Sequence, residues 1–113
     1  MDNHSSLARI IKCVKQNKVL WTAHVDIRLR ERKINRNFLF DSADTFEIIK
    51  CYPADRRLPC FLIYAEHGEL KLHFVIAYNE IEDNIKIITA YIPDIKEWLS
   101  DYKTRRKYCK RFS

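Results

Sequence analysis

The spacing of hydrophobic residues near the start of the chain is typical of α-helices. Leu7, Ile10, Ile11 and Val14 fall on one side of a helix, while lysines fall on the other sides. This pattern predicts an amphipathic helix over residues 7–17 whose apolar stripe packs on a core.

Two more helices are predicted before the pattern changes. The second covers residues 22–32 and is opened by Thr22, a residue type that caps helix N-termini with its side-chain oxygen. The third is short, covers residues 34–44 and is opened by Asn35. The side chains expected to face the core are Trp21, Val25 and Leu29 around the second helix, and Leu39 and Ala43 in the third.

After Asp44 the chain becomes rich in β-branched and aromatic residues, separated by short polar breaks. Four strands are predicted, over residues 45–52, 60–66, 69–78 and 84–92. Because the connections between them are short, we expect a curved, four-stranded antiparallel meander rather than crossover units.

A last helix is predicted after Pro93, with Asp94 as its N-cap and Glu97 three residues further on. Its apolar stripe would consist of Ile95, Trp98, Leu99 and Tyr102, and would close over the sheet. The expected fold class is therefore α+β, a small antiparallel sheet with N-terminal helices and a C-terminal helix packed on it.

Length and composition place the chain among globular proteins. Its 113 residues fit one domain, residues 1–113, and 47% hydrophobic residues with a single Gly exclude disordered or collagen-like classes. Neither a signal peptide nor a membrane-spanning stretch is visible, so we expect a cytoplasmic protein without membrane contact. Its cysteines would then be reduced, buried thiols, with Cys51 and Cys60 facing each other across a hairpin. Their spacing does not favour a zinc site, so neither metal nor cofactor is expected.

The net charge of +6 favours an acidic partner: nucleic acid, an acidic protein or an anionic membrane surface. Charge alone does not choose among these partners. A more local signal is the row formed by His24, Arg28 and Arg32 at four-residue intervals. Such a row spans about 12 Å and can follow a phosphate backbone, each Arg gripping one phosphate through two hydrogen bonds. An ordinary helix face with an Arg–Glu31 ion pair is an equally good interpretation.

The strand over residues 69–78 places His73 on its less apolar face. Thr89 and Tyr91 share a face of the following strand, but the hairpin register decides whether it is the face of His73. A hydrogen-bonded core histidine and two ordinary strand residues are the alternative interpretation.

Several of these stretches, in their order, resemble a little-characterised prokaryotic family, the domain of unknown function 4258. They are "HVDIRLRERKI", "LHFVIAY", "IKIITAYIPD" and "EWLSDYKTRRK", and the resemblance covers roughly residues 20–107, leaving 108–113 as a basic tail. This family is often grouped with the RelE, ParE and BrnT toxins. The grouping implies a RelE-like fold and a toxin that cleaves messenger RNA, commonly on the ribosome, or inhibits gyrase. The family's motif residues fall on His24, Arg28, Arg32, His73, Thr89 and Tyr91.

A metal-independent ribonuclease needs a base for the RNA 2′-hydroxyl, an acid for the leaving 5′-oxygen and cations around the phosphorane-like transition state. His24 or His73 would act as base or acid, Tyr91 as proton donor or stacking surface, and Arg28 and Arg32 as charge stabilisers. RNA and a cognate antitoxin are the expected partners. Alternatives are a non-catalytic toxin homologue that acts on a protein target, and a stand-alone nucleic-acid-binding or protein-binding module.

Basic residues near the C-terminus, around Tyr108, predict sequence-independent and salt-dependent RNA affinity. A solvated helix end is the alternative interpretation, because cations there complement the helix dipole. The candidate RNA-binding residues are Lys71, Lys103, Arg105, Arg106, Lys107, Lys110 and Arg111.

Overall fold

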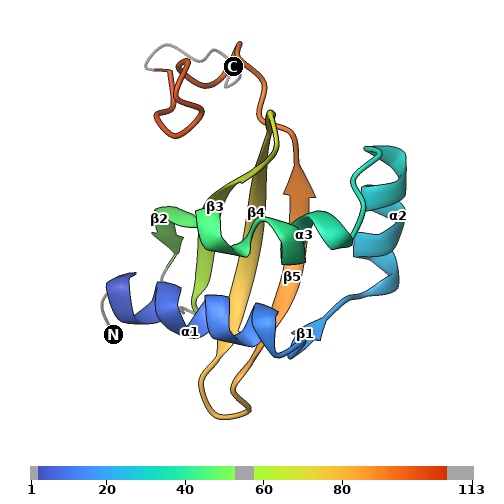
Figure 1. Ribbon diagram of the computed structural model, residues 1–113, viewed down its shortest axis with the longest axis vertical. Helices are drawn as coiled ribbons and strands as arrows, with labels where there is room; N and C mark the ends of the chain where they lie inside the picture. The colour runs from blue at the N-terminus through green and yellow to red at the C-terminus, as the bar shows by residue number, and fades with distance from the viewer. Residues whose placement is uncertain (1–2, 53–57, 107–113) are drawn as a thin grey trace.

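The computed structural model describes residues 3–52 and 58–106 of the chain (Figure 1). Apart from the two-residue strand β1, helices come first and strands second, as the hydrophobic pattern predicts. The elements in chain order are α1 (Asn3–Lys15), β1 (Val19–Leu20), α2 (Ala23–Glu31), α3 (Asn37–Asp41), the 3-10 turn η1 (Ala43–Thr45), β2 (Glu47–Tyr52), β3 (Cys60–His67), β4 (Leu70–Asn79) and β5 (Asn84–Tyr91). The predicted α+β class is confirmed.

The sheet has five strands in the order β1-β5-β4-β3-β2, not the four that the sequence predicts. Strands β2 to β5 form the expected antiparallel meander. The additional strand is β1, which pairs parallel with β5 through Val19 opposite Ile85 and Leu20 opposite Lys86. Two residues are too few to show the alternation by which a strand is recognised in a sequence.

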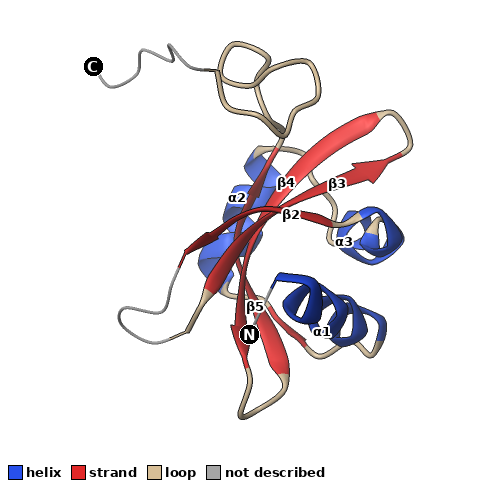
Figure 2. Ribbon diagram, turned by 90° about the vertical axis from the view of Figure 1, so that its left-hand side faces the viewer, coloured by secondary structure: helices blue, strands red, loops and turns tan. Residues whose placement is uncertain are grey.

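Helices α1 and α3 cover one face of the sheet (Figures 1 and 2). Their inward residues Ile10, Val14 and Leu39 join one hydrophobic core with the sheet residues Phe74 and Ile76, all essentially inaccessible to solvent. Helix α1 begins four residues before the predicted start and ends two before the predicted end. The third predicted helix is divided into α3 and η1, and its predicted inward residues are buried.

Helix α2 lies beside β5, along the edge that β1 leaves uncovered (Figure 1). Its predicted N-cap is confirmed, since the Thr22 hydroxyl accepts a hydrogen bond from the Val25 amide at 3.1 Å. At the other end Lys33 has a positive φ of 59°, and the Ile34 amide donates to the Leu29 carbonyl at 2.9 Å. A helix that ends in this way usually has glycine at the position of Lys33. Here the burial of the next residue, Ile34, holds Lys33 in the left-handed conformation.

The predicted C-terminal helix is wrong, because residues 92–106 form turns and one isolated bridge, Trp98 to Arg105. The turn opened by Asp94 extends only as far as Trp98, whose amide donates to the Asp94 carbonyl. The Asp101 carboxylate then accepts from the amides of Lys103 and Thr104, both at 2.9 Å. Such side-chain acceptors offer the backbone an alternative to the helical ladder and reverse the chain.

The cysteine expectations are met in part. Cys13 is buried, but Cys51 is exposed and Cys60 is half-buried. The register places Cys51 opposite Phe61 and Cys60 opposite Tyr52, so these two thiols do not face each other. No helix within the described ranges is long and apolar enough to cross a membrane.

Candidate functional site

The β4–β5 register brings three of the predicted site residues onto one face. His73 lies opposite Tyr91, and Val75, two residues beyond His73 on the same face, lies opposite Thr89. This is the face turned away from α1 and α3, because the core residue Phe74 points to the other side. We call it the open face of the sheet.

His73 is the centre of the cluster on the open face. Its Nε2 lies 2.7 Å from the backbone carbonyl oxygen of Tyr102, which can only accept, so Nε2 carries the proton. In the neutral ring Nδ1 is then the acceptor, and it accepts a hydrogen bond from the Tyr91 hydroxyl at 3.2 Å. Tyr91, His73 and the Tyr102 carbonyl therefore form a hydrogen-bonded chain, which we call the relay.

Burial keeps this imidazole neutral. His73 has 0% of its surface exposed, and the loss of solvent lowers its pKa. The Tyr102 carbonyl raises the pKa and the Arg105 charge lowers it, both less strongly than burial. Burial likewise raises the pKa of Tyr91, so the phenol keeps its proton at neutral pH.

Aromatic rings enclose His73 from the C-terminal segment and the neighbouring strand. The Trp98 ring meets the imidazole edge-on with 4.5 Å between centroids, and Tyr64 on β3 does so at 6.3 Å. Trp98 is itself buried, with 4% of its surface exposed. The turn-rich segment after β5 is thus anchored on the open face by a hydrogen bond and a packed ring.

Arg32 reaches the same region from the end of α2. Its guanidinium Nη1 donates to the Thr89 hydroxyl at 3.1 Å and to the Ala90 carbonyl at 2.8 Å. It therefore satisfies an acceptor of β5, the strand whose outer edge β1 covers only in part. The arginine charge also lies close enough to Tyr91 to act on its pKa.

The other two members of the predicted row stay on α2. His24 and Arg28 are exposed, and Arg28 pairs with Glu31 at 3.5 Å. On helical geometry His24 lies about 12 Å from Arg32. The structure therefore brings Arg32, His73, Thr89 and Tyr91 together and leaves His24 and Arg28 apart.

A hollow of about 360 Å³ lies on the open face between the sheet and the C-terminal segment. Two predicted RNA-binding residues line it, Lys103 and Arg105, and each has an acidic partner: Glu47 at 2.9 Å and Glu97 at 3.5 Å. Its lining consists of Ile49, Lys50, Tyr52, Leu62, Trp98, Lys103, Thr104 and Arg105.

The remaining predicted RNA-binding residues lie outside this hollow. Lys71 is half-buried and pairs with Glu66 at 3.7 Å, and Arg106 donates to the Ile95 carbonyl at 2.7 Å. Lys107, Lys110 and Arg111 lie outside the described residues. Nowhere in the described ranges do three or more His, Cys, Asp or Glu side chains gather in a way that would hold a metal ion.

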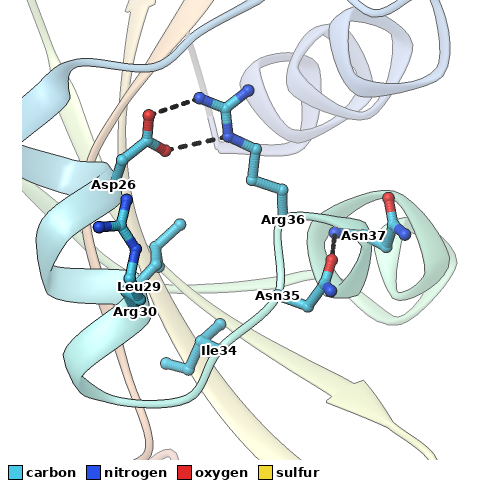
Figure 3. Close-up of a pocket in the computed structure, with 7 residues that line it drawn as sticks. All are labelled: Asp26, Leu29, Arg30, Ile34, Asn35, Arg36 and Asn37. Carbon is cyan, nitrogen blue, oxygen red and sulfur yellow. Dashed lines mark hydrogen bonds and ion pairs between the residues drawn. The ribbon is translucent and has the colours of Figure 1, made fainter.

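A larger hollow of about 530 Å³ lies at the corner between α2 and α3 (Figure 3). Two of its three charged lining residues neutralise each other, since Asp26 accepts two hydrogen bonds from Arg36, at 3.0 and 2.7 Å; the third is Arg30. The candidate catalytic residues do not line this hollow. They do not line the smaller hollow either, but its lining includes Trp98, which packs against His73 with 4.5 Å between ring centroids, so the smaller hollow is the better candidate site.

Sequence reasoning missed Lys50, Tyr52 and Trp98 as site residues. Lys50 and Tyr52 alternate at the end of a predicted strand, a pattern equally typical of any solvated strand face. The sequence pattern places Trp98 in the apolar stripe of a predicted helix that does not form. The alternation of Lys50 and Tyr52 along the strand was the one signal that could have pointed to them. It shows that they share a face of the sheet but not which residues lie next to them.

These features define a class of protein: a small α+β domain with helices on one face of a mostly antiparallel sheet and a polar, aromatic cluster on the other. Within this class the chain belongs to the family described as Domain of unknown function (DUF4258), whose model matches residues 21–92. The family predicted from the sequence is confirmed, and the match includes Arg32, His73, Thr89 and Tyr91. No curated protein and no solved structure matches the chain.

Proposed function

We propose that this protein is a RelE-like toxin of a toxin–antitoxin system that cleaves messenger RNA without a metal ion. The observation that carries the proposal is the relay from the Tyr91 hydroxyl through His73 to the Tyr102 carbonyl. An activated hydroxyl is expected to have three parts: the group that transfers the proton, a base that accepts it, and a third group that fixes the tautomer of the base.

In this proposal the RNA lies on the open face with a 2′-hydroxyl against Tyr91. The Tyr91 oxygen takes the 2′-proton as its own proton passes to Nδ1 of His73, so that no phenolate forms. The hydrogen bond from Nε2 to the Tyr102 carbonyl, which raises the pKa of His73, stabilises the transient imidazolium that burial disfavours. The 2′-oxygen bonds to the adjacent phosphorus, the bond from phosphorus to the 5′-oxygen breaks, and water protonates the 5′-oxygen. The products are a 2′,3′-cyclic phosphate and a 5′-hydroxyl, and the proton on His73 returns to solvent through Tyr91.

Charge on the pentavalent phosphorus needs cations nearby. Arg32 is held beside Thr89 and Arg105 lines the adjacent hollow, and both charges act on the pKa of Tyr91. His73 does not touch substrate, because it is fully buried; it is a positioning residue that accepts the Tyr91 proton. His24 has no part in this reaction.

Partners and location belong to the same proposal. The RNA would include mRNA on the ribosome, and the toxin would act in the cytoplasm under the control of an antitoxin. An antitoxin with an acidic segment suits the net charge of +6. The segment would compete with RNA for the same cations.

The test is induced expression of the parent protein, Tyr91→Phe and Arg32→Gln, with growth measured and new RNA ends mapped. Arg30→Gln is the matched control, because Arg30 is an exposed arginine on the same helix that lines only the other hollow. Loss of a proton-transferring group typically slows a reaction about 10²- to 10⁴-fold, so Tyr91→Phe should abolish cleavage while Arg30→Gln retains it.

Cleavage in vitro of an RNA with one 2′-deoxy substitution at the cut site separates the chemical alternatives. The proposal requires that this substitution block cutting and that the natural RNA give a cyclic phosphate. Growth arrest without new RNA ends would refute it and favour the non-catalytic homologue that acts on a protein. Binding of RNA without cutting or arrest would favour a binding module.

A further inference from the structure

The hollow on the open face has an apolar floor and a basic rim. Leu62 and Trp98 are each only 4% exposed, whereas Tyr52 at the edge is 38% exposed. A volume of about 360 Å³ is at the lower end of the ~300–1,000 Å³ typical of sites for small organic ligands. The hollow therefore suits a flat, partly apolar group of modest size that also carries negative charge.

The cations around the hollow differ in how they are neutralised. Lys103 and Arg105 have carboxylate partners, Glu47 and Glu97, and each also lies over an aromatic ring. Lys50 differs: its ammonium nitrogen lies 5.3 Å from the centroid of the Tyr52 ring, and it forms no ion pair with any carboxylate of the described residues. Lys50 is thus the cation best able to take an external anion.

The position of the hollow relates it to the cluster around Tyr91. Trp98 forms part of the floor of the hollow and also packs against His73 at 4.5 Å, and His73 accepts a hydrogen bond from the Tyr91 hydroxyl. Tyr52 is near enough to Tyr91 to act on its pKa. A group bound in the hollow would share Trp98 with the cluster around Tyr91.

We propose that this hollow binds one unpaired nucleotide of the RNA strand, with its base on the apolar floor beside Tyr52 and its phosphate at Lys50. The proposal rests on the proposed function for its choice of an RNA strand. Each base has a face that can stack on an aromatic ring, so a site of this kind needs a single strand and tolerates many sequences. A base in a duplex is already stacked and paired and does not reach the floor.

The test uses protein with Trp21→Phe, so that Trp98 is the remaining one of the two tryptophans and its fluorescence reports on the hollow. The probes are uridine 3′-monophosphate, inorganic phosphate alone, a single-stranded all-2′-deoxy decamer that cannot be cleaved, and the same decamer as a duplex. Lys50→Ala, Tyr52→Ala and Tyr52→Leu are compared with Lys12→Ala, a control that removes an exposed lysine from α1, on the other face of the sheet.

The single-stranded decamer should change Trp98 fluorescence saturably and bind more tightly than the monophosphate. Loss of base stacking should raise its Kd about 5- to 100-fold in both Tyr52 variants. Lys50→Ala should raise the Kd about tenfold and weaken its dependence on salt, while Lys12→Ala should not. A urea unfolding curve for each variant excludes loss of folding, and Tyr52→Leu keeps most of the buried apolar surface.

Several results would overturn the inference: equal affinity for single strand and duplex, equal affinity of the parent and the hollow variants, or binding of phosphate alone as tightly as of the nucleotide. A monophosphate that binds as tightly as the decamer would assign the hollow to a free nucleotide. The two proposals fail separately. If the protein binds the nucleotide but does not cleave RNA, the inference about the hollow is retained and the proposed function is refuted. If cleavage is unaffected by substitution of Lys50 and Tyr52, the proposed reaction is retained and the inference about the hollow is refuted.

Discussion

His73→Phe is the substitution that most directly tests how the open face is held together. Phenylalanine is somewhat larger than histidine, so it leaves no cavity, and its ring can keep edge-on contact with Trp98. It removes both hydrogen bonds, the one from Nε2 to the Tyr102 carbonyl at 2.7 Å and the one from the Tyr91 hydroxyl at 3.2 Å. The substitution therefore isolates the polar contribution of a side chain that has no solvent exposure.

The magnitude follows from what each former partner can do next. A buried polar group left without a partner costs about 1–3 kcal/mol. Tyr91 is only half-buried, so its hydroxyl can turn to water and the cost there lies near the lower end. The Tyr102 carbonyl faces the buried ring, so the cost of leaving it without a partner is near the upper end of this range. Together they predict a loss of about 2–4 kcal/mol in the free energy of unfolding.

The same residue makes stability depend on pH. Burial lowers the pKa of His73 in the folded protein below the ~6.5 of an exposed imidazole. As the pH falls below about 6.5 the unfolded chain binds a proton that the folded protein does not, so unfolding becomes more favourable. The stability that neutral His73 provides is therefore fully present above about pH 6.5 and decreases as the pH falls below it. The free energy of unfolding changes there by at most about 1.4 kcal/mol per pH unit.

Urea unfolding at pH 7.5 and 5.5, followed by Trp98 fluorescence in Trp21→Phe protein, measures both effects. The parent should lose more stability between the two pH values than His73→Phe does. A variant as stable as the parent at pH 7.5, with the same change at pH 5.5, would refute this account of the buried imidazole. It would also remove the basis for the Tyr91 relay.

Three further substitutions test how local sequence sets the fold. Thr22→Ala should destabilise the protein by about 1 kcal/mol through loss of the α2 cap, and Thr22→Asp should not; equal urea midpoints for the two would contradict this. Lys33→Gly should stabilise by about 1 kcal/mol because it relieves a positive φ, whereas Lys33→Ala should leave the urea midpoint unchanged. Asp101→Ala should loosen the C-terminal segment, seen as increased acrylamide quenching of Trp98; unchanged quenching would show that the Asp101 hydrogen bonds do not hold the turn. Hydrogen bonds from the Lys103 and Thr104 amides lower the pKa of Asp101, so its contribution is present above about pH 4 and is lost as the pH falls further.

Local signals in the sequence were enough to identify most elements. The helical stripe that includes Ile10 and Val14, the Thr22 cap and the β-branched runs of β3 and β4 act over a few residues, and the structure contains each of them. The failure at residues 94–102 was also local in origin. An N-cap and an apolar stripe were both present, but the Leu99 amide donates to the Thr104 carbonyl and the Asp101 carboxylate accepts from two of the amides that follow it, so the chain turns back instead of continuing the helix.

The sequence by itself determined an α+β protein, the family to which it belongs and a short set of polar residues that merit attention. The β4–β5 register decided which of them meet, because a shift of one residue would have sent Tyr91 to the opposite face from His73. The tertiary structure also turned Arg32 away from the row of His24 and Arg28 and onto the edge of β5. These outcomes depend on contacts between residues up to 58 positions apart, which no local pattern of hydrophobic and polar positions encodes.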